Sequence, residues 1–315
     1  MPDSLIECVP NFSEGQRPEV VKAIVAAMRV EGVYLLDWSM DRDHNRSVVT
    51  VAGTPAAVVE SAVRGAGKAA ELIDLTSQQG VHPRIGAADV IPFVPIRDIS
   101  LEQCALLARH AGQAIWSRYQ VPVYFYEAAA ARPDRAMLEE VRRGQFEGLR
   151  DAVLKEPARR PDVGGPSLHP TAGASAVGAR RFLIAFNLYL DRPDVSIARA
   201  IAKDIRQSGG GLAGVKAMGV SAQGQAQVSM NITDFTRTPV GEVYAAVKEK
   251  ARRHGAVPVR AELIGLIPEA ALERNSEWLR LLVGFNPDEF NPGGFDLGRK
   301  VLERRLEQPL AWPNP

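Results

Sequence analysis

The sequence predicts an α/β protein of the α+β kind, and three features of its pattern support this. Short apolar runs typical of strands alternate with amphipathic helical segments along the chain. The order strand, helix, strand, strand, helix, strand occurs twice, and corresponding helices open with Thr54-Pro55 and Thr238-Pro239. This order is that of ferredoxin-like β-α-β-β-α-β units. We therefore expect two ferredoxin-like halves with mixed sheets and a crevice between them.

Hydrophobic periodicity defines the elements of the first half. Val20 and Ile24 fall on one face of a helix that Pro18 can begin, because proline is tolerated in a first turn. Thr54 is expected to cap the next helix. Short runs of apolar residues between turn residues predict the strands. The expected elements are strands at 5–11, 33–38, 47–51 and 90–96 and helices at 18–28 and 55–74.

The strand at 90–96 and the helix after it have distinctive local signals. Pro92 and Pro95 donate no ladder hydrogen bond, so we expect their strand at a sheet edge or with irregular ends. Ser100 and Gln103 have the spacing of a capping box, which predicts a helix start. The elements expected next are a helix from 100, a strand at 121–126 and a mostly helical stretch at 135–154.

A long irregular segment at 156–179 separates the halves. It is rich in Gly, Pro, Ser and Ala, and it is either a linker or a functional loop, since small residues let a flat ligand approach the backbone. We place an N-terminal domain at 1–178 and a C-terminal domain with a tail at 179–315. The elements expected in the second half are strands at 182–190, 215–220, 226–235 and 257–266 and helices at 195–207 and 240–254.

Composition excludes several classes of protein. The formal charge is only +1 over 315 residues, which argues against a nucleic-acid groove or a polybasic membrane surface. The chain has neither a signal-peptide pattern nor an apolar run of membrane-spanning length, so we expect a cytoplasmic protein with no membrane partner. Cys8 and Cys104 are far apart, and the five histidines lack zinc-site spacing, so we expect no metal.

Ionisable residues gather just before the strand at 90–96. Pro83 disfavours helical dihedrals at His82, so Arg84, two residues after His82, should project to the same side. Imidazole titrates near neutral pH, which makes His82 the first candidate for proton transfer. The alternative interpretation is an ordinary loop histidine.

Several motifs in a fixed order resemble one known family. They are Leu5-Ile6-Glu7-Cys8-Val9-Pro10-Asn11-Phe12-Ser13-Glu14-Gly15, His82-Pro83-Arg84-Ile85-Gly86-Ala87, Arg181-Phe182-Leu183-Ile184-Ala185-Phe186-Asn187 and Ala226-Gln227-Val228-Ser229-Met230-Asn231. Together they resemble glutamate formimidoyltransferase, and the similarity runs from about Leu5 to about Leu272.

The resemblance implies transfer of a formimidoyl group from N-formimidoyl-L-glutamate to tetrahydrofolate, a co-substrate, in histidine breakdown. It matches His82 to the family's catalytic histidine and implies a homodimer. Some members of the family are fused to a cyclodeaminase, which here would be a separate protein. It also implies a folate-binding loop made of Val163, Gly164, Gly165, Pro166, Ser167, Leu168, His169, Pro170, Thr171 and Ala172.

The reaction needs charged groups besides His82. A guanidinium can pair with a substrate carboxylate in bidentate fashion, and Arg84 is the first candidate and Arg46 the second. Asp41 or Asp89 would orient the imidazole, although either can equally be a solvated turn residue or an ion-pair partner. Vertebrate members of the family have an acidic residue where this chain has Ser39. The residues that could supply this carboxylate instead are Asp37, Asp41 and Asp43.

Two other functions stay open from the sequence. One is a non-catalytic folate-binding sensor, because duplicated ferredoxin-like units also serve as regulatory domains and a fold does not define a function. The other is a transferase of the same mechanism that uses N-formyl-L-glutamate. Turnover with each donor distinguishes these functions from the first.

Overall fold

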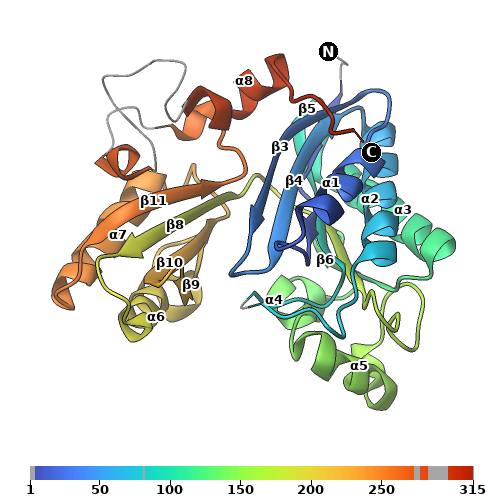
Figure 1. Ribbon diagram of the computed structural model, residues 1–315, viewed down its shortest axis with the longest axis horizontal. Helices are drawn as coiled ribbons and strands as arrows, with labels where there is room; N and C mark the ends of the chain where they lie inside the picture. The colour runs from blue at the N-terminus through green and yellow to red at the C-terminus, as the bar shows by residue number, and fades with distance from the viewer. Residues whose placement is uncertain (1–3, 81, 273–276, 283–296, 315) are drawn as a thin grey trace. The chain divides into compact units, whose positions relative to one another are not determined.

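The structure, a computed structural model, describes residues 4–80, 82–272, 277–282 and 297–314. These residues form two sheets and eight α-helices, the mixed α/β architecture that the sequence predicts (Figure 1). Two compact units are present. The first runs to Arg181 and includes the segment from Pro309, and the second is Phe182–Gln308.

The sheet of the first unit is mixed. β1 and β2 lie end to end, with β4 on one flank of both and β5 on the other, and β3 extends the sheet beyond β4. These pairings are antiparallel, whereas β5, β7 and β6 pair in parallel. The strands are β1 (Leu5–Cys8), β2 (Asn11–Phe12), β3 (Val33–Asp41), β4 (Arg46–Gly53), β5 (Ala88–Arg97), β6 (Val123–Glu127) and β7 (Ser175–Ala179).

Helices cover one face of this sheet and enclose the core of the unit (Figure 1). Alternate residues of β1, such as Ile6, pack in one cluster with Ile24 and Val58 of the helices, and all three side chains are fully buried. The helices of the unit are α1 (Pro18–Ala27), α2 (Pro55–Leu72), α3 (Leu101–Tyr119), α4 (Leu138–Val141) and α5 (Gln145–Lys155).

β5 is an interior strand, so the expectation of an edge position is wrong. It pairs with β1 and β2 on one side and with β7 on the other. Pro92 still offers its carbonyl to the Val9 N–H, and Pro95 lies beyond the last pair formed with β7. The expected irregularity is present, because the register shifts in the pairing with β1 and again in the pairing with β2. The prolines therefore occupy positions where a missing N–H does little harm.

Two further expectations for the first unit are corrected by the structure. Residues 175–179, expected in the irregular loop, form the fully buried strand β7. A parallel strand that is buried on both faces need not alternate, so its small residues gave no periodic signal. The helical stretch expected at 135–154 is broken into α4 and α5 around Gly144, whose φ of +87° does not fit a helix.

The second unit has one four-stranded sheet in the order β11-β8-β10-β9. All its described pairings are antiparallel, so the expectation of a mixed sheet holds only for the first unit. The β9–β10 hairpin joins antiparallel neighbours, whereas α6 and α7 each connect strands that have another strand between them. Its elements are β8 (Ile184–Leu190), α6 (Val195–Ile205), β9 (Val215–Ala222), β10 (Gln225–Ile232), α7 (Val240–Arg253), β11 (Pro258–Ile264) and α8 (Leu302–Glu307).

The predicted capping box at the start of α3 is confirmed and gives a stability test. The Ser100 hydroxyl accepts from the Gln103 N–H at 3.2 Å, and the Gln103 side chain accepts from the Ser100 N–H at 2.8 Å. We expect Ser100→Ala to lower the free energy of unfolding by about 1 kcal/mol, because an N-terminal N–H loses its acceptor. Urea denaturation measures this, and a loss below about 0.3 kcal/mol would contradict it.

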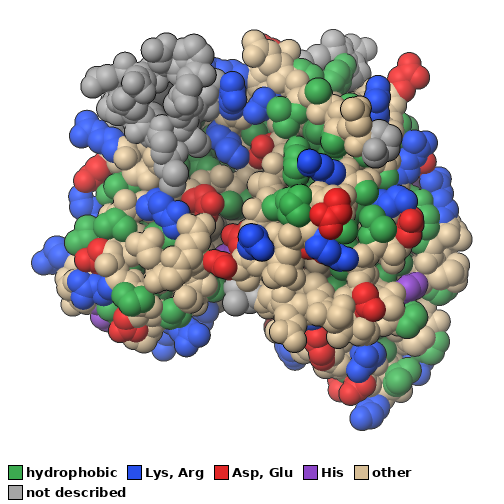
Figure 2. Space-filling view, viewed as in Figure 1, with side chains coloured by type: hydrophobic (Ala, Val, Ile, Leu, Met, Phe, Trp, Pro, Cys, Tyr) green, Lys and Arg blue, Asp and Glu red, His purple; other side chains and the backbone are tan. Residues whose placement is uncertain are grey.

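Charged side chains of both signs are interspersed with hydrophobic ones on the face shown in Figure 2. Within the part of the chain that the structure describes, none of the helices is both long enough and apolar enough to span a bilayer.

Candidate functional site

A small cavity in the first unit collects polar side chains from four segments of the chain. These segments are the turn after β2, the β3–β4 turn, the connection from α2 to β5, and the start of β5. The cavity volume is about 10 Å³, room for about one water molecule. The lining residues are Phe12, Ser13, His44, Asn45, Arg46, Gln78, His82, Arg84 and Asp89.

Hydrogen bonds from side chains to the backbone hold these segments together. Asn45 has a φ of +47°, which asparagine tolerates better than most residues. Its Oδ1 accepts from the Gly15 N–H at 2.9 Å, and its Nδ2 donates to the Gln79 carbonyl at 2.6 Å. The Ser13 hydroxyl donates to the Gly86 carbonyl at 2.7 Å. The β3–β4 turn thus fixes both the N-terminal turn and the segment that carries the histidine.

The contacts of His82 define its tautomer. Its Nδ1 lies 2.8 Å from the Pro83 carbonyl, which can only accept, so Nδ1 carries the proton. Its Nε2 is in contact with Nη1 of Arg46, which can only donate, so Nε2 carries the lone pair. Burial, followed by the charges of Arg46 and Arg142, holds the pKa of His82 well below its usual value of 6.5, and His44 adds to the shift. The imidazole is therefore neutral at physiological pH.

Arg46 is a cation with unused hydrogen-bonding capacity. It begins β4, where it is paired across the ladder with Asp41 of β3. Its Nε is buried and has no hydrogen-bond partner. Burial and then the nearby charge of Arg142 lower its pKa to about 10, against the opposing charges of Asp89 and Asp41. A guanidinium whose buried N–H is unpaired is suited to bind an anion.

Arg84 is buried and is occupied by contacts within the protein. Its Nη1 and Nη2 donate to the two carboxylate oxygens of Glu147 at 3.0 and 2.8 Å. Its Nε donates to the Gln78 side chain at 2.6 Å, and Nη2 also donates to the Gln78 carbonyl at 2.9 Å. The predicted proximity of Arg84 to His82 is present, since both line the cavity, but the donors of Arg84 are engaged.

Neither carboxylate expected to orient His82 contacts its ring. Asp89 accepts from the Ile85 N–H at 2.8 Å and forms an ion pair with Arg142. Asp41 is 3.0 Å from Nδ1 of His44 and accepts from the His44 N–H at 2.8 Å. Burial acts to raise the pKa of Asp41, but the hydrogen bonds from His44 outweigh it and lower that pKa. The orienting group is the Pro83 carbonyl instead, because both carboxylates already have closer donors. Asp37 and Asp43 are absent from the residues that line the cavity.

The loop at 163–172 lies next to the histidine segment but does not line its cavity. Residues 164–167 are exposed, and the Gly165-Pro166 peptide bond is cis. At the end of the loop, the Ala172 carbonyl accepts from the Ala87 N–H at 2.9 Å. Gly173 follows with a φ of +68°, and a side chain there would meet the backbone. The loop is thus bonded to the backbone that leads from His82 into β5.

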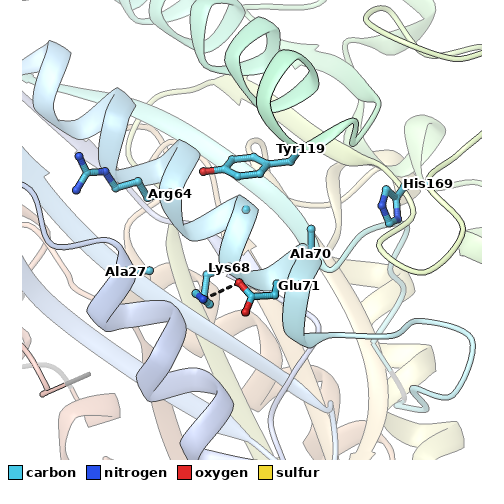
Figure 3. Close-up of a pocket in the computed structure, with 8 residues that line it drawn as sticks. Ala27, Arg64, Lys68, Ala70, Glu71, Tyr119 and His169 are labelled. Atoms are coloured by element: carbon cyan, nitrogen blue, oxygen red, sulfur yellow. Dashed lines mark hydrogen bonds and ion pairs between the residues drawn. The ribbon is translucent and has the colours of Figure 1, made fainter.

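His169 of this loop lines a different and larger hollow of about 510 Å³. Figure 3 shows that Arg64, Lys68 and Glu71 come from α2, that Tyr119 comes from α3 and that His169 comes from the loop. Lys68 donates to Glu71 at 2.6 Å, so this cation is already paired. The hollow shares no lining residue with the cavity of His82.

Sequence reasoning missed Arg142, Asn45 and Gln78. Arg142 precedes the glycine that separates α4 and α5, and a helix break flanked by basic residues was the only signal for it. Asn45 and Gln78 act through hydrogen bonds to distant backbone, which no local pattern shows. Among the described residues, no group of three or more His, Cys, Asp and Glu side chains is arranged to hold a metal ion.

Comparison with known proteins adds two family matches. Residues 5–180 match the N-terminal subdomain of the formiminotransferase domain, and residues 185–280 match the formiminotransferase domain. Glutamate formimidoyltransferase of Streptococcus pyogenes serotype M1 is 42% identical over 96% of this chain and 98% of its own length. The enzyme of the same name from Thermoplasma acidophilum is 43% identical over 97% of this chain and 98% of its own length.

Fused relatives match a shorter part of the chain. The formimidoyltransferase-cyclodeaminase of Gallus gallus is 42% identical over 85% of this chain and 51% of its own length. The match thus spans about half of that bifunctional protein.

Proposed function

The chain belongs to the formiminotransferase domain family, and from this premise we propose how it transfers the formimidoyl group of N-formimidoyl-L-glutamate to N5 of tetrahydrofolate. The products are 5-formimidoyltetrahydrofolate and L-glutamate. One observation supports the assignment of the site above the others. A neutral histidine, His82, presents its Nε2 lone pair to a half-buried arginine, Arg46, whose buried Nε–H is unpaired.

His82 acts first as base and then as acid. N5 of tetrahydrofolate attacks the amidine carbon and becomes positively charged as the new C–N bond forms. Nε2 of His82 removes the proton from N5, and the resulting imidazolium gives it to the nitrogen of glutamate as the old C–N bond breaks. Such transfer contributes about 10²- to 10⁴-fold in rate. The low pKa of His82 keeps it in the basic form before the first step.

Arg46 binds a carboxylate of the donor. The substrate has two carboxylates, and a carboxylate near Arg46 competes with His82 for the N–H donors of the Arg46 guanidinium. When the guanidinium turns to the carboxylate, Nε2 of His82 loses its partner and is free to accept the proton from N5. Substrate binding thereby exposes the base. Arg84 supports the site from behind through Glu147 and Gln78, a positioning role that leaves the carboxylate to Arg46.

The remaining parts of the site follow from the same premise. The loop at 163–172 contacts folate, which its exposed backbone at 164–167 permits. Asp89 holds the histidine segment through the Ile85 N–H, and Asp41 holds His44. The ferredoxin-like character of the second half has support in the strand order β11-β8-β10-β9, and that of the first half stays a prediction. The crevice between the halves, the homodimer, the cytoplasmic location and ring closure by a separate cyclodeaminase stay predictions.

Single-turnover transfer tests this function. Enzyme in excess is mixed with tetrahydrofolate and N-formimidoyl-L-glutamate, and product is followed by absorbance. We expect rapid transfer with this donor and slow transfer with N-formyl-L-glutamate. Faster transfer from the formyl donor would contradict the donor assignment. Tight folate binding with no transfer from either donor would favour the sensor.

The pH dependence of this step tests the role of His82. The pKa of His82 in the folded protein lies well below 6.5, so its ring is fully in the neutral, basic form above pH 6.5. This form is lost only as the pH falls through the folded pKa. We expect the single-turnover rate at saturating substrate to be flat above pH 6.5 and to fall on the acid side. Arg46→Gln removes the charge that lowers the pKa of His82 most, so the acid limb of the variant's pH profile should move to higher pH.

Arg42→Gln is the matched control for this shift. Arg42 lies exposed in the same β3–β4 turn, and its charge is not among those that lower the pKa of His82. We expect its profile to match that of the wild type. An acid limb that stays in place in Arg46→Gln would contradict the assignment of His82 as the titrating base.

A further inference from the structure

Asn11 lies in the interior of the first sheet, on the face opposite α1 and α2. Phe12, the next residue of β2, packs in one cluster with Ile24 of α1 and Val58 of α2. Successive side chains of a strand point to opposite faces, so Asn11 points away from these helices. Its own pairing partners are Val48 of β4 and Val90 of β5, so a strand lies on each side of it.

The orientation of the Asn11 amide is fixed by its own turn. Nδ2 donates to the Val9 carbonyl at 2.7 Å, and because a carbonyl can only accept, Oδ1 must be on the other side of the amide. Asn11 is 6% exposed, and among the described residues its buried Oδ1 has no hydrogen-bond donor. Buried side-chain oxygens nearly always accept a hydrogen bond. Capping the turn at Val9 uses only Nδ2, so that role does not explain the unpaired oxygen.

Arg46 is a diagonal neighbour of Asn11 on the same face. It lies two residues before Val48, the cross-strand partner of Asn11, so both side chains point to the same side. The Cα atoms of such diagonal neighbours are about 7–8 Å apart. Nε–H of Arg46 is a buried donor without an acceptor, and Oδ1 of Asn11 is a buried acceptor without a donor, within the part of the chain that the structure describes. A ligand that carries both an acceptor and a donor would satisfy both groups.

The donor substrate carries this pair of groups. Its formimidoyl group is an amidine, which is protonated at neutral pH and then has N–H donors and no lone pair. Its α-carboxylate has acceptors only. A single nitrogen and Cα separate the amidine carbon from this carboxylate, so the two groups can reach neighbouring side chains on one sheet face.

We propose that Asn11 determines which donor the enzyme uses, because its Oδ1 accepts a hydrogen bond from the terminal N–H of the formimidoyl group while Arg46 binds the carboxylate. This inference rests on the proposed function and adds a specificity-determining residue to it. Nε2 of His82 is in contact with Arg46, so a donor bound to both residues has its amidine carbon beside the base.

The same oxygen disfavours the formyl donor. A formyl oxygen has lone pairs and no proton, so it would meet Oδ1 as a second acceptor. Attack by N5 increases this mismatch, because the formyl carbonyl becomes an oxyanion, whereas the formimidoyl group becomes an amine that keeps its N–H donors. Sites that hydrogen-bond a substrate N–H strongly reject analogues that lack it. We therefore expect the discrimination to be larger in the rate of transfer than in binding.

Asn11→Leu tests the proposal through the ratio of two rates. Single-turnover transfer to tetrahydrofolate is measured at subsaturating N-formimidoyl-L-glutamate and at subsaturating N-formyl-L-glutamate. Leucine has a similar size but no acceptor, so transfer from the formimidoyl donor should fall about 10- to 100-fold, the effect of losing a hydrogen bond to a charged group. Transfer from the formyl donor should stay constant or rise. A purely structural role of Asn11 would lower both rates by the same factor.

Ser47→Ala is the matched control. Ser47 follows Arg46 in β4, and its buried Oγ also has no hydrogen-bond partner among the described residues. It pairs across the ladder with Phe12, so its side chain points to the helices and away from Asn11. Removing this oxygen should leave both rates, and their ratio, at the wild-type values.

A wild-type measurement keeps the proposal testable if Asn11→Leu does not fold. In calorimetry without folate, the wild type should bind the formimidoyl donor at least about tenfold more tightly than the formyl donor. Equal affinity for the two donors would overturn the inference, as would an unchanged rate ratio in a folded Asn11→Leu protein. Both results leave the proposed function intact. Failure of the wild type to transfer the formimidoyl group would instead overturn that function.

Discussion

His82→Ala should lower the single-turnover rate of formimidoyl transfer by about 10²- to 10⁴-fold. The reason is that Nε2 of the neutral His82 ring carries a lone pair that can accept a proton, while Nδ1 donates to the Pro83 carbonyl. Removing the imidazole leaves the proton of N5 to solvent and leaves the departing amine without an acid. Folate affinity, measured by calorimetry, should stay close to that of the wild type.

A control variant separates this loss from a general effect of removing a histidine. His110 lies exposed on α3, outside the lining of the cavity, so His110→Ala should transfer at the wild-type rate. A His82→Ala protein that keeps the wild-type rate would refute the acid-base role. Loss of folate binding together with the rate would instead indicate a structural or binding role for His82.

The sequence predicts which residues form helices and strands better than it predicts which strands pair in the sheet. The capping box at Ser100 and the helix that begins at Pro18 depend on residues a few positions apart, so local chemistry decides them. The interior position of β5 depends on β7, a strand more than 80 residues later with no alternating pattern. Its two prolines favour an edge locally, and only the register shows why they are tolerated inside a sheet.

The candidate site shows the same division. His82 and Arg84 could be singled out because they flank a proline next to a strand. The contacts that they make could not be predicted, because Glu147 and Arg46 reach them from α5 and β4. The sequence expectation that Arg84 meets the substrate before Arg46 treated all arginines as equally available. Hydrogen bonds within the fold occupy the donors of Arg84, which is why we propose Arg46 for the substrate carboxylate.

Asp89→Ala should cost about 3–5 kcal/mol in the free energy of unfolding, the largest stability effect that we expect. The Asp89 side chain is 3% exposed and forms an ion pair with Arg142, whose side chain is 14% exposed. The alanine leaves that cation buried without its partner, and it also removes the acceptor of the Ile85 N–H. Chemical denaturation monitored by circular dichroism measures the loss.

The charge is the main cause, so removing both partners should cost less than removing one. Asp89→Ala combined with Arg142→Met no longer buries an unpaired cation, and we expect it to regain part of the lost stability. Asp151→Ala, on the exposed side of α5, should change stability by no more than about 0.5 kcal/mol. A double variant that is less stable than Asp89→Ala would show that the lost backbone hydrogen bond and packing dominate. The histidine segment would then be held chiefly by packing and the backbone hydrogen bond. The main effect of Arg142 would be its positive charge, which lowers the pKa of His82.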